Sequence, residues 1–154
     1  MTNNQRLEIE DLLNSYDLSH RFIVRYAVAC ATTVKSEMTA EGLKALALAE
    51  RYGAGEDIPK QELRDAADDA YTSYADYAAW SADSADYAAN AAAWSAYAAF
   101  ATHYASYAAY YASAASKSNK NKIDYKQMLL DMIHSEYTEF ELLMMGCSNE
   151  SISA

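Results

Sequence analysis

The sequence predicts an all-α protein, and its composition and residue spacing carry that prediction. Only four Gly and one Pro occur in 154 residues, and alanine, the strongest helix former, is the commonest residue. Apolar residues recur mainly at helical spacing. A chain of this length buries one hydrophobic core. We therefore expect a single-domain helical bundle of about six helices over residues 1–145, with residues 146–154 as a loose C-terminal tail.

The first part of the chain predicts three helices in succession. Apolar residues within 7–13 indicate a short first helix, and a broad apolar stripe over 17–35 indicates a largely buried second helix. Thr39 is suited to the N-cap of a third helix, because its hydroxyl can accept from a free backbone N–H. Glycines at 53–55 should end that helix, and Pro59 suits the first turn of the next.

An Ala/Tyr-rich segment follows, with 23 Ala and nine Tyr in the 54 residues 62–115. As one helix it would be about 80 Å long, more than the width of such a domain. Side chains that favour helix caps make 81–84 the best place for a break. We expect two long helices near 60–81 and 84–116, and a final amphipathic helix over 123–144.

Charge and composition exclude several classes of protein. A net charge of -10 argues against nucleic-acid binding, which needs clustered Lys and Arg. Cys30 and Cys147 form no CxxC motif, and the polar start of the chain lacks an export signal, so we expect a soluble, cytoplasmic protein. The uncharged stretch 87–116 is long enough to span a bilayer, but its Asn, His, Ser and Tyr residues argue against a membrane span.

Aromatic residues recur at seven-residue intervals in the Ala/Tyr-rich segment, which keeps each set on one side of a helix. The sets are Trp80, Tyr87 and Trp94; Tyr97, Tyr104 and Tyr111; and Phe100 and Tyr107. They can fill the core or a subunit interface, or they can line a binding site. Nine tyrosine hydroxyls exceed what one small core satisfies. We therefore expect a homo-oligomer or a ligand site that includes Trp80, Trp94, Tyr97, Tyr104 and Tyr107.

Basic residues offer a second element of a binding site. His20, Arg21 and Arg25 form a cluster in which the two arginines share a helix face, and Arg21 and Arg25 could clamp an anionic ligand. The alternative is that they form ion pairs with the Asp-rich segment. His103 lies among aromatic residues, where it is either a core histidine or a ligand contact.

Catalytic and metal-binding patterns are weak. Asp17 with His20, and Asp131 with His134, have the spacing of the carboxylate and histidine pairs of di-iron bundles, but further bridging carboxylates are not identified. The sequence has no glycine-rich phosphate loop and no identifiable nucleophilic triad. We expect no metal, no cofactor and no enzymatic activity.

The order of four segments resembles an Ala-rich helical immunity-protein family that is found near bacterial polymorphic toxins and in phage genomes. These segments are DLSHRFIVRYAVACATTV, GLKALALAERYGAGE, an Ala-rich double helix containing AFATHYASYAAYYA, and a closing amphipathic helix. The resemblance covers about residues 17–144, and its more specific matches are Arg21, Cys30, Gly55-Glu56 and Thr102-His103. The sequence differs from the family in having Tyr and Asp where the family has many arginines.

The resemblance implies a non-enzymatic protein that neutralises an antagonist. Together with the aromatic pattern, it leads us to expect an immunity or anti-defence type binding protein with a Tyr/Trp-lined surface. The antagonist is either a small nucleotide-like signal or a protein effector. The alternatives are a structural protein that self-associates through its Ala/Tyr helices and a carboxylate-bridged metalloenzyme.

Overall fold

The computed structural model describes residues 1–77, 83–116 and 122–145, and these residues confirm the all-α class. They form eight α-helices, one short 3₁₀ helix and no strand. The α-helices are α1 (Asn3–Ser15), α2 (His20–Thr32), α3 (Ala40–Gly53), α4 (Lys60–Tyr77), α5 (Asp83–Tyr97), α6 (His103–Ala115), α7 (Tyr125–Glu136) and α8 (Glu139–Met144); the 3₁₀ helix η1 is Lys35–Glu37.

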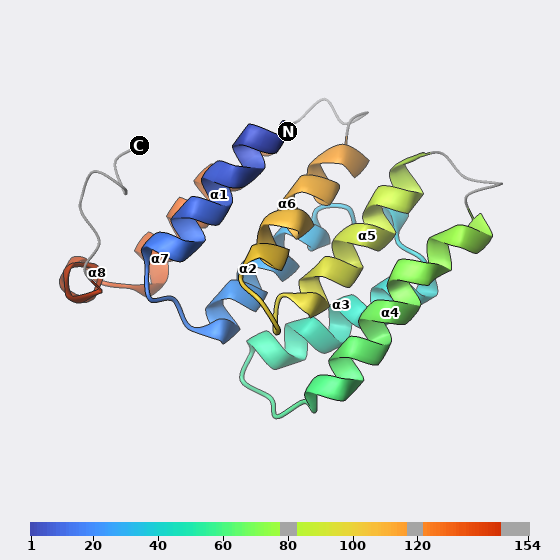
Figure 1. The fold of residues 1–154 in the computed structure, drawn as a ribbon, viewed down its shortest axis with the longest axis horizontal. Coiled ribbons are helices and arrows are strands. Elements are labelled where there is room, and N and C mark those ends of the chain that lie inside the picture. The colour runs from blue at the N-terminus through green and yellow to red at the C-terminus, as the bar shows by residue number, and fades with distance from the viewer. Residues whose placement is uncertain (78–82, 117–121, 146–154) are drawn as a thin grey trace.

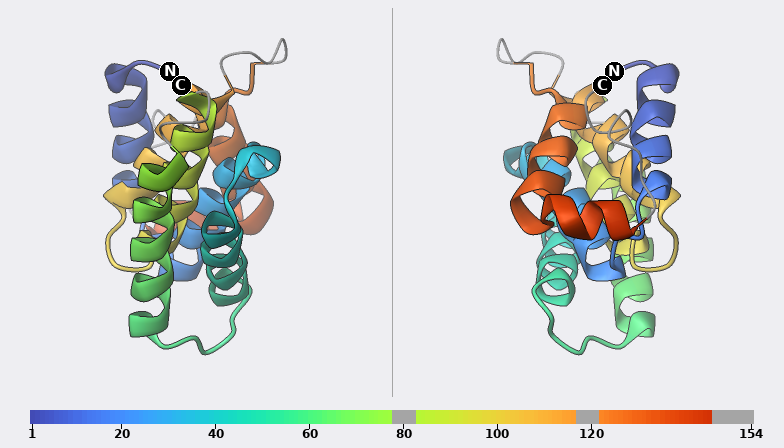
Figure 2. Two further views of the ribbon diagram at one scale, coloured as in Figure 1. Left: turned by 90° about the vertical axis from the view of Figure 1, so that its right-hand side faces the viewer. Right: turned by 90° about the vertical axis from the view of Figure 1, so that its left-hand side faces the viewer.

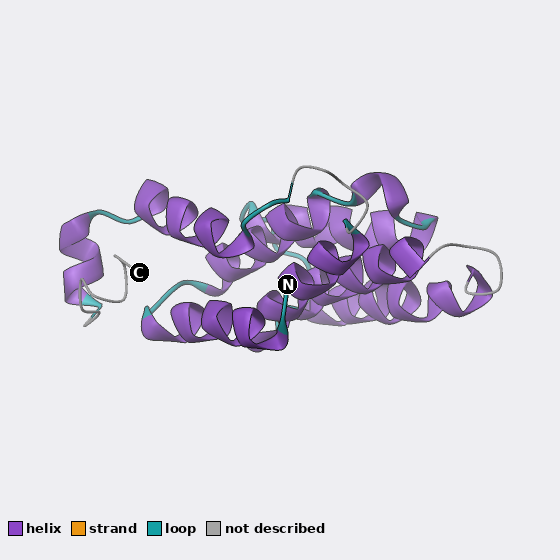
Figure 3. Ribbon diagram, turned by 90° about the horizontal axis from the view of Figure 1, so that it is seen from above, coloured by secondary structure: helices purple, strands orange, loops and turns teal. Residues whose placement is uncertain are grey.

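The helices form two layers (Figures 1 and 3). One layer contains α1, α6, α5 and α4 in that order, and the other contains α7, α2 and α3. Helix α2 packs against α3, α5 and α6, so it lies at the centre of the molecule. Helix α8 runs across the end of α7, at the edge of the molecule (Figure 2).

Polar side chains fix where most of these helices begin. Thr2, Ser19, Thr39, Asp124 and Thr138 each accept a hydrogen bond from the backbone N–H three residues on. Such bonds satisfy N–H groups that the first helical turn leaves free. The predicted N-cap of α3 is therefore confirmed.

Alanine forms much of the interior around α5 and α6. All the alanines from 88 to 99 are buried, as are five of the six in α6. Small side chains let α5 approach α2 and α3 closely, and let α6 approach α2. Larger core residues come from the other helices, and the fully buried ones include Leu13, Phe22, Tyr26, Leu129 and Ile133.

The prediction of one helix over residues 84–116 is wrong. The chain leaves the helix after Tyr97, turns back through residues 98–102, and starts α6 at His103. An unbroken helix of that length would extend about 50 Å. Folding back instead packs α5 and α6 against each other and buries alanines of both helices against α2. Residues 81 and 82, within the predicted break, lie outside the described residues.

The predicted final helix over 123–144 is also divided in two. Helix α7 ends at Glu136, Tyr137 adopts an extended conformation, and Thr138 caps α8. The Tyr137 ring packs edge-on against Phe22, at 5.4 Å between centroids, which holds this turn against the core. The count of about six helices was therefore too low. The predicted loose tail, residues 146–154, lies outside the described residues.

The second predicted helix, 17–35, is shorter than expected. Ser19 caps α2 at His20, and the chain passes from α2 through Thr33 and Val34 into η1.

Among the helices that the structure describes, none combines the length and the apolar character needed to cross a membrane.

Candidate functional site

A continuous group of half-exposed aromatic side chains lies on α4, α5 and α6. The alanines at 88–96 of α5 and five of the six in α6 are buried, and the aromatic residues of these helices are half-buried on the other side. We call this group the ring surface; its members are Tyr71, Tyr87, Trp94, Tyr97, Tyr104, Tyr107 and Tyr111. Tyr71 is 42% exposed and the others are half-buried.

Trp94 is the centre of the ring surface. Its ring centroid lies 5.0 Å from that of Tyr104, 5.3 Å from those of Tyr97 and Tyr107, and 6.3 Å from that of Tyr71. These are ordinary distances for aromatic pairs. The indole N–H of Trp94 is buried and has no hydrogen-bond partner among the described residues. A buried donor without an acceptor costs about 1–3 kcal/mol, and such exceptions call for a structural or functional explanation.

The buried Arg6 of α1 borders the ring surface. Its guanidinium lies 4.3 Å from the ring centroid of Tyr107 and donates to Ser106 Oγ at 3.1 Å. Glu10 Oε2 accepts a further bond from the same guanidinium at 2.9 Å, so the positive charge is paired. The arginine therefore joins α1 to α6 and places a cation against a tyrosine face.

A carboxylate borders the opposite side of the ring surface. The Tyr97 hydroxyl donates to the exposed carboxylate of Asp68 on α4. Burial, and then the hydrogen bond to Asp68, raise the pKa of Tyr97 well above its ordinary value. Burial likewise raises the pKa of Tyr111, followed by the effect of Tyr71. Both phenols therefore stay protonated at neutral pH and act as hydrogen-bonding groups rather than as bases.

The two predicted anion-binding arginines lie elsewhere. Arg21 donates to the carbonyls of Tyr52 and Glu56, and its guanidinium stacks 4.5 Å from the Tyr52 ring centroid. Arg25 donates to the Gly53 carbonyl and pairs with Glu136. Both arginines thus bind carbonyls at the C-terminal end of α3, where cations are favoured. They are not among the cations that contact the ring surface.

The alternative interpretation of the arginines is also wrong in its detail. Among the side chains that the structure describes, Arg25 forms its ion pair with Glu136 at the end of α7 and not with an Asp of the Asp-rich segment. The reason is the position of α2, whose start lies beside the end of α3 and the end of α7.

His103 begins α6, and its ring centroid lies 4.2 Å from that of Tyr104. The side chain is exposed, so the interpretation as a core histidine is wrong. Its position places it at the edge of the ring surface. The structure thus brings together five of the predicted ligand residues, namely Trp94, Tyr97, His103, Tyr104 and Tyr107. Trp80 lies outside the described residues.

The proposed metal pairs gain no support. Within the described residues, no three His, Cys, Asp or Glu side chains lie close enough together to hold a metal ion. Cys30 is fully buried in α2, and burial raises the pKa of its thiol to about 12. The thiolate that a nucleophile or metal ligand requires is therefore disfavoured at neutral pH.

Two hollows in the described surface lie away from the ring surface. One, of about 600 Å³, lies along α7, and the other, of about 670 Å³, lies between the first residues of the chain, the end of α6 and residues 122–126. Neither is lined by a member of the ring surface.

Sequence reasoning missed Arg6 and Tyr71. Arg6 has a local signal, its spacing of four residues from Glu10, but that spacing does not indicate a contact with Tyr107 far along the chain. Tyr71 lies on a different helix from Trp94, and only the packing of α4 on α5 brings their rings together.

Compared with known proteins, the chain matches no family model, no curated protein and no solved structure.

Proposed function

We propose that this protein is a non-enzymatic binding protein that captures a protein effector through the ring surface. The observation that carries the proposal is the half-exposed set of rings around Trp94, bordered by Arg6 and Asp68. Tyr, Trp and Arg are enriched at the energetically important centres of protein interfaces. Aromatic side chains offer a large contact area and have few torsions to immobilise on binding.

The packing of the rings favours a protein partner over an enclosed small molecule. Neighbouring ring centroids on Trp94 are 5.0–6.5 Å apart, so the rings already contact one another and leave no slot for an inserted base. The nucleotide-like alternative also relied on Arg21 or Arg25, whose guanidinium groups are occupied at the end of α3. Half-exposed rings that line neither of the two hollows suit a macromolecular partner.

The immunity or anti-defence role is supported by the family resemblance and by the charge of the chain. A net charge of -10 accelerates association with a basic partner and disfavours acidic ones. Exposed carboxylates on α4, including Asp65 and Asp68, lie beside the ring surface and contribute to this field. We therefore propose a basic protein effector as the antagonist.

The test is site-specific photocrosslinking in cells that produce the protein. A benzophenone amino acid replaces Tyr71 in the ring surface or, as the matched control, Leu43, an exposed apolar residue of α3. We expect a single protein adduct from position 71 and none from position 43. Adducts at both positions, or at neither, would argue against the proposal.

The captured protein then permits a direct binding measurement. Tyr71→Ala and Tyr107→Ala should each weaken its affinity by about tenfold or more, as expected for central interface residues, whereas Leu43→Ala should change it by less than about twofold. Native mass spectrometry of the purified protein tests the alternative, in which the ligand is a small molecule. A retained small molecule, lost in Tyr107→Ala, would replace the protein effector with a small ligand.

Self-association is the second candidate, and a specific observation restricts it. The alanine faces of α5 and α6 are buried within one chain, so they are not free to pair between subunits. A homo-oligomer would use the ring surface instead. Light scattering tests this: a dimer that Tyr71→Arg converts to monomer would support self-association through the ring surface.

A further inference from the structure

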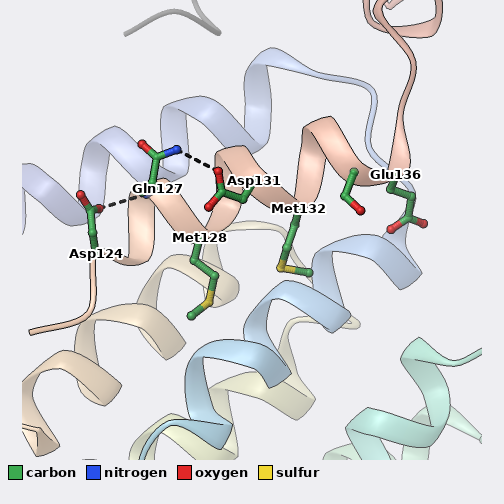
Figure 4. A pocket seen from close by; sticks show the side chains of 7 residues that line it. Asp124, Gln127, Met128, Asp131, Met132 and Glu136 are labelled. Carbon is green, nitrogen blue, oxygen red and sulfur yellow. Dashed lines mark hydrogen bonds between the residues drawn. The ribbon is translucent and has the colours of Figure 1, made fainter. Parts of the chain in front are cut away.

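A groove on α7 lies at the edge of the molecule opposite α4, and none of its lining residues belongs to the ring surface (Figure 1). It has a volume of about 600 Å³ and is lined by Asp124, Gln127, Met128, Asp131, Met132, Ser135 and Glu136. Met128 and Met132 leave α7 on the same side, four residues apart, while Gln127 and Asp131 lie on the other side (Figure 4).

The two methionines give the groove an apolar floor. Both are half-buried and pack against the hydrophobic core, so the floor is supported from below. Methionine is unbranched and polarisable, which lets it adapt to apolar side chains of different shape. A volume of about 600 Å³ accommodates several side chains of a docked segment.

Carboxylates border this floor. Asp124 accepts from the backbone N–H of Gln127 at 3.0 Å, and Asp131 accepts from the Gln127 side-chain amide at 2.9 Å. Both of these donors are neutral. Glu136 pairs with Arg25 at one end of the groove. Within the described residues, Asp124 and Asp131 therefore have hydrogen bonds but no cationic partner.

Exposed apolar side chains continue beyond the groove on α8, which begins three residues after Glu136. Phe140 is 71% exposed, Leu143 57% and Met144 73%. Three exposed apolar residues on one short helix form an apolar patch, whereas ordinary surfaces expose such residues singly. Glu139 and Glu141 lie on the same helix, so the negative charge of the groove also extends onto α8.

Charge decides between the candidate occupants of this groove. A second copy of the chain would bring its own α7 and α8 carboxylates against Asp124, Asp131 and Glu136, which like-charge repulsion disfavours. A basic amphipathic helix meets both requirements. Its apolar side would lie on Met128 and Met132, and its Lys or Arg side chains would pair with Asp124 and Asp131. We infer that the α7 groove is a second docking site, for a basic amphipathic helix of another protein.

The test uses a fluorescent peptide of roughly 15 residues, long enough for four helical turns, with Leu at helical spacing and Lys elsewhere. Asp131→Lys changes an exposed residue of the groove. Asp69→Lys is the matched control, because it makes the same change of charge at an exposed residue of α4. We expect the peptide to bind the wild-type protein, and Asp131→Lys to weaken it by about tenfold. Asp69→Lys should change the affinity by less than about twofold.

Methionine methyl NMR locates the bound peptide. The signals of Met128 and Met132 should shift on titration, whereas that of Met38 next to α3 should not. Equal weakening by Asp131→Lys and Asp69→Lys would reduce the binding to general charge attraction and overturn the inference. A wild-type dimer that Asp131→Lys dissociates would also overturn it, since the occupant would then be a second copy.

The two proposed sites fail independently. Tyr71→Ala alters the ring surface and should leave the affinity for the Leu/Lys peptide unchanged, while Asp131→Lys should leave the adduct at position 71 unchanged. Loss of peptide binding in Tyr71→Ala would place the peptide on the ring surface and contradict a separate groove site.

Discussion

Tyrosine has two structural roles in this chain, and burial separates them. Tyr26 is fully buried, and its hydroxyl donates to the Tyr125 carbonyl at 2.9 Å. The Tyr125 ring is also buried, and its hydroxyl bonds to Thr33 Oγ1 at 2.8 Å. Together these bonds join α2 to the start of α7. Tyr71 and Tyr107, in contrast, present ring area at the surface.

This difference predicts unequal effects of removing a hydroxyl. Tyr26→Phe should lower the free energy of unfolding by about 1 kcal/mol, because a buried hydrogen bond is lost without a replacement by water. Tyr110→Phe, at a half-exposed residue of α6, should change it by less than about 0.5 kcal/mol. Urea denaturation of both variants is the measurement. Equal losses would contradict the division into two roles.

At the level of single residues, the sequence predicted the aromatic character of the candidate site better than it predicted which residues form it. The seven-residue spacing predicted that Trp94, Tyr104 and Tyr107 belong to the candidate site, and their rings do lie together. It could not identify Arg6, because that contact depends on how α1 packs on α6. The charge of Arg21 predicted a place in the site, but its guanidinium is already bonded to the carbonyls of Tyr52 and Glu56.

At the scale of elements, capping residues predicted where a helix begins and ends, whereas alanine did not. Thr39 and the glycines near 53–55 marked the two ends of α3 correctly. The turn between α5 and α6 has neither Gly nor Pro, and its alanines favour helix as strongly as their neighbours do. The turn lets α5 and α6 pack against each other and against α2, and local sequence does not reveal that gain.

The alanine faces predict a strong asymmetry within α6. Ala108→Leu should destabilise the protein by about 1–3 kcal/mol, because a fully buried alanine between packed helices has no room for a larger side chain. Ala114→Leu, at a half-exposed residue of the same helix, should have an effect below about 0.5 kcal/mol. Thermal unfolding followed by circular dichroism compares the two. A well-tolerated Ala108→Leu would mean that the helices are less tightly packed than described.

At the scale of the whole molecule, burial of phenols links stability to alkaline pH. The pKa values of Tyr26, Tyr97, Tyr111 and Tyr125 are all raised above the ordinary value of 10.0, with burial as the largest cause. Above pH 10 the unfolded chain therefore releases protons that the folded chain retains. Because the unfolded state then binds fewer protons, its free energy falls relative to that of the native state.

We therefore expect the stability of the protein to be lost as the pH rises above about 10. The urea midpoint should be lower at about pH 11 than at about pH 9, and Tyr26→Phe should reduce the difference. Tyrosinate absorbance should rise at higher pH in the folded protein than in urea. A midpoint independent of pH over this range would show that the phenols titrate alike in both states.

The separation of alanine and aromatic faces on α5 and α6 has a consequence for substitutions. Alanine has no side-chain torsion to immobilise, so the inner face supports the fold without depending on which rings lie outside. The outer rings are half-buried and pack against this interior, so their exchange alters the outer layer and not the alanine positions beneath it. Substitutions at the outer ring positions should therefore change what the ring surface presents, while the alanine-packed interior keeps its arrangement.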